Sequence, residues 1–218
     1  RGLGLAGVLL GVPLLIRASR SATFARTFGR ASAFAFRHAS MTAGGLAVVW
    51  FAIAVAVAYF VHKPYPHISD GFCYYFQAKI FAGKALFAPA PPLPEFFQFE
   101  WIAVHQGRWF SIFPPGWPLL LAAGISLGVP VLVNPVLGAL CVLVVFHLAK
   151  TLYGSRQGLL SALFCCLSPF FLFMSSEFMS HTAALLFTSL STLCLVKAAA
   201  RPSGMGLFAA GRGGAGMA

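Results

Sequence analysis

Long runs of apolar residues constrain this chain more than any other feature. The first clear run, GGLAVVWFAIAVAVAYFVH at residues 44–62, is long enough to cross a bilayer as a helix. Further runs of comparable length cover residues 131–149, 158–175 and 182–199. Because every backbone polar group in lipid needs an internal partner, such segments are predicted to be helical. The sequence therefore predicts an all-α, polytopic membrane protein with about four transmembrane spans.

The composition agrees with a membrane protein and argues against a nucleic-acid partner. The chain is 59% hydrophobic and only 9% charged, so it cannot present an ordinary charged surface to water. Its net charge is +11, but the Lys and Arg residues are scattered between apolar runs instead of gathered on one polar domain. They are typical of topology signals. The five cysteines form neither a disulfide framework nor a zinc-binding spacing.

The distribution of basic residues predicts how the spans are oriented. Residues 17–37 are rich in Arg and contain no acid, which favours a cytoplasmic position for this segment. The loop 63–130 then lies outside, while the turn around Lys150 and Arg156 returns to the cytoplasm. An odd number of crossings must separate the two. We therefore expect the short apolar segment 117–127 to be an interfacial helix that does not cross.

The two ends of the chain allow several interpretations. Within the basic N-terminal segment 1–43, residues 2–16 form an apolar run that suits a signal-peptide core or a truncated span. Residues 17–37 suit an amphipathic arm on anionic lipid, a transit-like leader, or upstream sequence translated by mistake. In the last case Met41 is a natural start. The tail 201–218 is predicted to be disordered or artefactual, because it has no periodicity. These features also suggest that the chain is a fragment.

The acidic residues are few and are predicted to lie on one side of the membrane. There are four in the chain, Asp70, Glu95, Glu100 and Glu177, and the topology above puts all of them outside or at the outer interface. The segment that starts at Asp70 is predicted to be an amphipathic surface helix, with a polar stripe of Asp70, Gln77 and Lys84. The proline-rich residues 88–94 are predicted to be a stiff polyproline connector.

Each polar residue of the loop has a structural interpretation beside the functional one. Asp70 suits either a helix cap or a catalytic base. Solvated loop charges explain Glu95 and Glu100, and His105 alone indicates little. Phospholipid headgroups are an alternative to substrate phosphate for the basic side chains, which are Lys79, Lys84 and Arg108.

Glu177 and His181 differ from the loop residues, because they lie where two apolar spans meet in a very short turn. Ionisable groups in such a place are costly, which suggests a function. The alternative is a satisfied contact between residues i and i+4 at a helix end.

Several segments resemble the amino-terminal portion of the GT-C glycosyltransferases. These polytopic enzymes include relatives of dolichyl-phosphate-mannose protein mannosyltransferases and bacterial aminoarabinose transferases. The resemblance covers about residues 44–200. Two departures stand out: Asp70-Gly71 replaces the Asp-Glu of many relatives, and His181 stands where they often have Asp. The matching segments are HISDGFCYYFQAKIFAGKALFAPAPP, GRWFSIFPPGWPLLLA, VLVNPVLGAL, LYGSRQGLLSALF and SPFFLFMSSEFMSHTAALL.

The resemblance implies an enzyme that moves a sugar from a polyprenyl-phosphate donor to an acceptor at the outer membrane face. Asp70 would be the base, and Lys84, Arg108 or a divalent ion would neutralise the departing phosphate. Carboxylates of Asp70 and Glu177, with His181, would suit Mg²⁺ or Mn²⁺. We expect the bacterial inner membrane as the location, ahead of the endoplasmic reticulum. The alternatives are a non-catalytic protein that binds or transports lipid, and a non-functional remnant.

Overall fold

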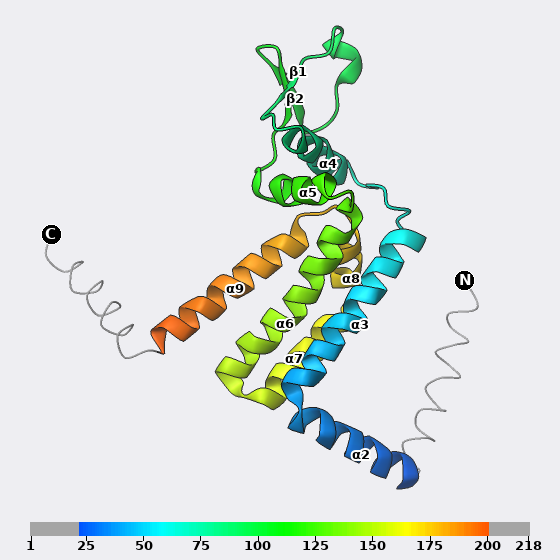
Figure 1. The fold of residues 1–218 in the computed structure, drawn as a ribbon, viewed down its shortest axis with the longest axis vertical. Coiled ribbons are helices and arrows are strands. Elements are labelled where there is room, and N and C mark those ends of the chain that lie inside the picture. The colour runs from blue at the N-terminus through cyan, green and yellow to red at the C-terminus, as the bar shows by residue number, and fades with distance from the viewer. Residues whose placement is uncertain (1–21, 201–218) are drawn as a thin grey trace, which may run out of the picture.

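The computed structural model describes residues 22–200 and shows a helix bundle with a small cap at one end (Figure 1). The expectations for residues 2–16 and for the tail 201–218 lie outside the described residues. The bundle is built from α3 (Ala39–Phe60), α6 (Val133–Tyr153), α7 (Ser155–Cys166), α8 (Pro169–Ser176) and α9 (His181–Ala199).

Three of these helices are long and apolar enough to cross a membrane: α3, α6 with the 3₁₀ turn η2 (Pro130–Leu132) before it, and α9. The helices α7 and α8 make a fourth candidate span, bent by 66°. The bend occurs at Pro169, which has no backbone N–H to continue the helical ladder, and Ser168 caps α8 by accepting from the N–H of Phe171. The predicted all-α fold with about four spans is confirmed.

Small residues let the bundle helices approach closely. Five alanines on α3 are buried, and Trp50 on the same helix stacks on Phe171 with ring centroids 4.7 Å apart. A Cβ added to Gly138 of α6 would lie 2.9 Å from both Ser175 and the indole nitrogen of Trp50. Close packing of small residues is the usual basis of helix association in lipid. It fixes α8, and hence the turn that follows it, against α3 and α6.

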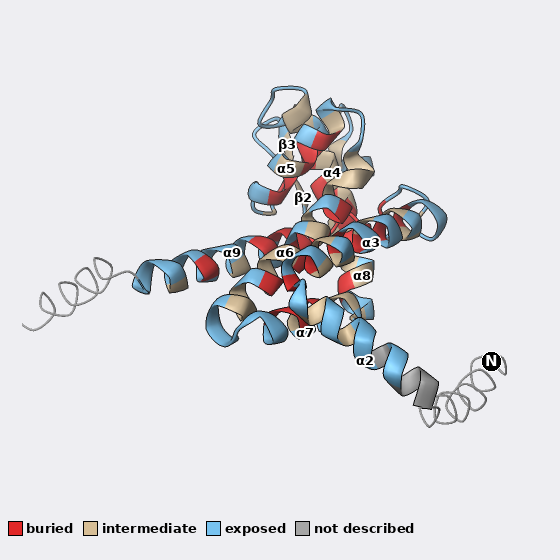
Figure 2. Ribbon diagram, turned by 60° about the horizontal axis from the view of Figure 1, so that its bottom comes forward, coloured by how far each residue is buried: buried red, intermediate tan, exposed pale blue. Residues whose placement is uncertain are grey.

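Many residues of the spans are exposed (Figure 2), and a large share of them are apolar. Val48 on α3 is 69% exposed, Phe164 on α7 is 69% exposed and Leu195 on α9 is 64% exposed. A large number of exposed apolar side chains is unfavourable in water and favourable in lipid. The chain is an integral membrane protein.

The basic segment before the first span is helical where the structure describes it. Helix α2 (Ala22–Arg37) lies at the end of the bundle opposite the cap (Figure 1). Arg156, at the start of α7, lies 5.2 Å from the ring centroid of Phe36, and the Nζ of Lys150 donates to Ser40 at 3.1 Å. Basic residues from separate parts of the chain therefore gather at this end.

The cap contains two short helices and a small sheet. Helices α4 (Ser69–Ala82) and α5 (Gly116–Ser126) lie across the end of the bundle in Figure 1, and α5 is too short for a span, as predicted. The sheet is antiparallel with the order β1-β3-β2, and the short 3₁₀ helix η1 (Pro94–Phe97) precedes β2. Its strands are β1 (Ala88–Pro89), β2 (Ile102–His105) and β3 (Arg108–Ser111).

The sheet differs from the predicted polyproline connector, because Ala88 and Pro89 pair with Trp109 and Arg108. The sequence does contain a signal for the hairpin that joins β2 and β3. Strands β2 and β3 are joined by Gln106-Gly107, and both residues have positive φ (49° and 73°), as a tight hairpin turn requires.

The predicted polar stripe on α4 is wrong. Gln77 is only 4% exposed: its amide donates to the carbonyl of Leu86 at 3.0 Å and accepts from the N–H of Ser111 at 2.9 Å. Lys84 lies beyond the end of α4. The amide therefore joins α4 to the sheet instead of facing water, which a heptad spacing alone does not reveal.

Candidate functional site

The four acidic residues gather at the capped end of the bundle. Asp70, Glu95 and Glu100 belong to the cap, and Glu177 ends α8 where the cap meets the spans (Figure 1). The structure therefore brings together, at one end, the acids that the sequence distributes over more than a hundred positions.

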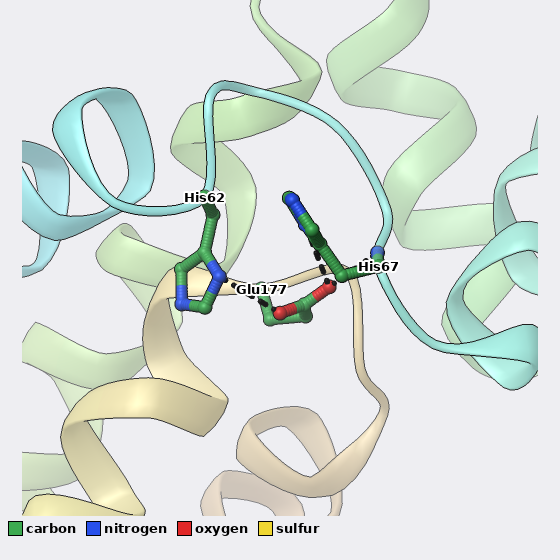
Figure 3. Close-up of side chains that lie close together, drawn as sticks. All are labelled: His62, His67 and Glu177. Carbon is green, nitrogen blue, oxygen red and sulfur yellow. Dashed lines mark hydrogen bonds and ion pairs between the residues drawn. The ribbon is translucent and has the colours of Figure 1, made fainter.

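Glu177 is the most buried acid and has two histidine partners from the segment that follows α3 (Figure 3). Its Oε2 lies 3.0 Å from Nδ1 of His62, and its Oε1 lies 3.8 Å from Nδ1 of His67. The same Oε1 accepts the backbone N–H of His67 at 2.9 Å. One ligand atom from each of the three residues lies within 4.8 Å of the others.

The surroundings of His62 favour its neutral form. Burial lowers the pKa of His62 below the ordinary value of 6.5, Glu177 opposes this shift, and His67 adds to it. The second ring nitrogen, Nε2, is buried without a hydrogen-bond partner among residues 22–200. Of the two ring nitrogens, only Nδ1, which faces Glu177, therefore has a polar partner among residues 22–200.

Two buried side chains hold the turn that presents Glu177. The amide of Asn134, at the start of α6, donates to the carbonyls of Met174, Glu177 and Met179. The indole of Trp117, on α5, donates to the carbonyl of Phe178 at 3.0 Å. Backbone carbonyls of a short turn need such partners when water is excluded. The turn between α8 and α9 is therefore fixed from two other helices.

Asp70 lies at the start of α4, half-buried and close to the same turn. The next residue, Gly71, packs against Pro66 and Phe178, since an added Cβ would lie 3.3 Å and 3.9 Å from their Cβ atoms. The alternative of a capping role is not borne out: Ile68 is the N-cap, and no side chain caps the helix. The Oγ of Ser69 lies 3.5 Å from the Asp70 carboxylate.

The predicted basic residues are exposed and belong to different parts of the cap. Lys79 lies 4.9 Å from the ring centroid of Tyr75, and Arg108 lies 4.5 Å from that of Phe87. Lys84 follows α4 with a φ of 61°. Of the three, Arg108 lines a cavity of about 340 Å³ between α4, the sheet and the start of α5.

His181 lies apart from the Glu177 cluster. It is exposed at the start of α9, edge-on to Phe170 with centroids 6.1 Å apart. Glu95, Glu100 and His105 are also exposed, in η1 and around β2. Sequence reasoning missed His62, His67, Asn134 and Trp117 as partners of the turn. Their polar side chains flank apolar runs, but only the fold shows which of them meet.

An apolar groove of about 430 Å³ runs between α4, α5 and α9. Trp117, Leu120, Ala183 and Phe187 contribute to its walls. At one place on its wall the hydroxyl groups of Tyr74 and Ser180 are 3.1 Å apart. The groove thus offers a mainly apolar surface next to the polar end of the bundle.

Comparison with protein families gives a match to the C-terminal part of the chain. Residues 114–218 match the family described as dolichyl-phosphate-mannose-protein mannosyltransferase. The resemblance is confirmed over these residues. No curated protein and no solved structure matches the chain.

The mannosyltransferase-like region begins at Pro114 and includes α5, α6 and the turn that carries Glu177. The match supports a membrane glycosyltransferase of the GT-C type. Asp70 precedes the matched region, so its catalytic role stays a prediction.

Proposed function

We propose that this protein transfers a sugar, of the hexose type, from a polyprenyl-phosphate donor to an acceptor at the extracytoplasmic face of the membrane. The observation that carries the proposal is the mannosyltransferase-like region, whose buried Glu177 lies at the same end of the bundle as the other three acids. A lipid-linked donor keeps its tail in the bilayer and its phosphate and sugar at the surface. A cap on the end of a transmembrane bundle could bind the phosphate and sugar at the surface while the tail stays beside the helices in the bilayer.

Asp70 is the proposed base. Transfer forms a bond between the anomeric carbon and a hydroxyl or amine of the acceptor, and breaks the bond to the donor phosphate. The acceptor loses a proton as the new bond forms, and a carboxylate within hydrogen-bond reach can take it. The half-buried position of Asp70 and its closeness to the Glu177 turn support this role.

Basic side chains of the cap are the proposed partners of the departing phosphate. Arg108 is the best supported, because it lines a cavity together with Gln77 and Ser111. Arg presents a planar fork that matches phosphate oxygens. Lys79, in the last turn of α4, and Lys84, just after this helix, are both exposed and suit longer-range attraction to the phosphate or to lipid headgroups.

The apolar groove supports the assignment of a lipid-linked donor. Its walls belong to α4, α5 and α9, so an isoprenoid chain bound there would end close to the cap. Because the donor's tail already lies in lipid, the groove would position the tail by packing and not by removing it from water.

The proposed sidedness follows from the charges at the other end of the bundle. The residues there are basic, with no acid among those that the structure describes: Arg26, Arg30, Arg37, Lys150, Arg156 and Lys197. Positive residues favour the cytoplasmic side, so the cap faces outward. A bacterial inner membrane, with the cap on its periplasmic face, is the proposed location.

The test is sugar transfer from a polyprenyl-phosphate hexose in proteoliposomes, with a membrane extract as the source of acceptor. Asp70→Asn is expected to lower the transfer rate by about 10²- to 10⁴-fold, the usual contribution of a general base. Glu95→Gln, an exposed acid of the same cap, is the matched control and should keep the parent rate. An Asp70→Asn protein with the parent rate would remove Asp70 from the mechanism. Binding of the donor without any transfer would favour a lipid-binding protein instead.

A further inference from the structure

We propose that His62, His67 and Glu177 bind one divalent transition-metal ion, with Zn²⁺ as the ion best suited to the three ligands. Such binding does not depend on the proposed function. The ion would join the segment after α3 to the turn between α8 and α9 (Figure 3).

The spacing of the donor atoms fits a tetrahedral ion. Zinc bonds nitrogen and oxygen ligands at about 2.0–2.1 Å, which puts neighbouring ligand atoms about 3.3 Å apart. In the structure, the Glu177 carboxylate lies 3.0 Å from Nδ1 of His62 and 3.8 Å from Nδ1 of His67. The two distances involve different carboxylate oxygens, and one donor atom from each residue lies within 4.8 Å of the others, so the three donors must draw together to bind an ion. The His67 side chain is 48% exposed, which leaves it room to move toward the other two ligands.

The chemistry of the donors selects the kind of metal. Two imidazoles and one carboxylate suit zinc and neighbouring transition metals, whereas Mg²⁺ prefers oxygen ligands and keeps several waters. The sequence led us to expect a Mg²⁺ or Mn²⁺ site whose ligands include Asp70 and His181. The fold instead brings His62 and His67 to Glu177. His181 lies at the start of α9 beside Phe170, outside the cluster.

The ligands are held in place by further contacts, as in established metal sites. The Glu177 carboxylate accepts the His67 N–H at 2.9 Å, and its side chain is only 4% exposed. Asn134 and Trp117 fix the turn that carries it. His62 is also largely buried, at 14% exposure, while the exposed His67 leaves a path for the ion to enter.

Three protein ligands leave one tetrahedral position open for water or another oxygen ligand. If the proposed function holds, a donor phosphate oxygen is a candidate for this position. The ion would also restrain residues 62–67, which lead directly into α4 and Asp70. Metal binding and sugar transfer are measured separately, so either proposal can fail alone.

The experiment uses the purified chain in detergent, without a polyhistidine tag and after treatment with a chelator. Titration with Co²⁺ is expected to give the intense visible absorption of a tetrahedral site at one ion per chain, and Zn²⁺ should displace it. Zn²⁺ should also raise the melting temperature. His67→Ala changes the exposed ligand, and Glu177→Gln keeps the size of the side chain. Each should weaken binding at least tenfold.

His181→Ala and His105→Ala are the matched controls and should bind the ion as the parent does. Size-exclusion chromatography and circular dichroism establish that each variant is folded. The proposal is overturned if the parent binds no Co²⁺, or if folded His67→Ala and Glu177→Gln proteins bind it as tightly as the parent. In either case the cluster is only a pair of histidine contacts to a buried carboxylate.

Discussion

Glu177 shows how much the surroundings of a single residue depend on the fold. A carboxylate with 4% side-chain exposure must have hydrogen-bond partners, because an unpaired buried charge is very costly. The sequence offers His181 four residues later, yet the partners come from His62 and His67, more than a hundred positions earlier. Local spacing cannot choose between these, since all three histidines are near apolar runs.

Cys73 gives a prediction at the same scale. Its thiol is buried in α4 and donates to the carbonyl of Glu100 at 3.1 Å. Burial, followed by the charges of Asp70 and Glu100, raises the pKa of Cys73 from 9.0 to about 11. Two pH units correspond to about 100-fold less thiolate at pH 8.

We therefore expect alkylation of Cys73 at pH 8 to be at least 100-fold slower in the folded protein than in denaturant. The measurement uses a variant with the other four cysteines replaced by alanine. Because the folded pKa is raised, the neutral thiol contributes stability that is present below pH 9 and lost as the pH rises toward 11. Equal alkylation rates in the folded and denatured protein would show that the thiol is accessible and unperturbed.

Among the elements, the long apolar runs and the two helices of the cap were predictable, and the small sheet of the cap was not. Residues 44–62 and 131–149 overlap α3 and α6 because a span needs only length and hydrophobicity. The small sheet depends on a hairpin at Gln106-Gly107 and on pairing across the proline-rich segment. Such pairing joins residues that are distant in sequence, and the alternation in IAVH and RWFS is too short to predict it alone.

The close contact between α6 and its neighbours gives a prediction about stability. A Cβ at Gly138 would meet Ser175 and Trp50 at 2.9 Å, so Gly138→Ala should destabilise the bundle by about 1–3 kcal/mol through overpacking. Gly45→Ala on α3 is the matched control, because an added Cβ has nothing within 4 Å there. Thermal unfolding in detergent should show a lower melting temperature for the first variant only. A Gly138→Ala protein as stable as the parent would contradict the packing described here.

At the scale of the whole molecule, the opposite ends of the bundle differ in charge. All four acids lie at the capped end, and the other end is basic where the structure describes it. This arrangement was predictable, because it follows from the positions of charges between apolar runs. The partners within the cap were not, since Asn134, Trp117 and His62 acquire their roles only when helices distant in sequence come together.

We propose that the capped end, with its acids and its cluster of His62, His67 and Glu177, faces the extracytoplasmic side. The most direct measurement is labelling of introduced cysteines by a membrane-impermeant maleimide, in a variant whose five native cysteines are replaced by alanine. Gln106→Cys lies in the exposed hairpin of the cap, and Gln157→Cys lies at the exposed start of α7 at the opposite end. We predict that intact cells label position 106 at once and position 157 only after permeabilisation. The reverse pattern, with position 157 labelled in intact cells and position 106 protected, would contradict the account.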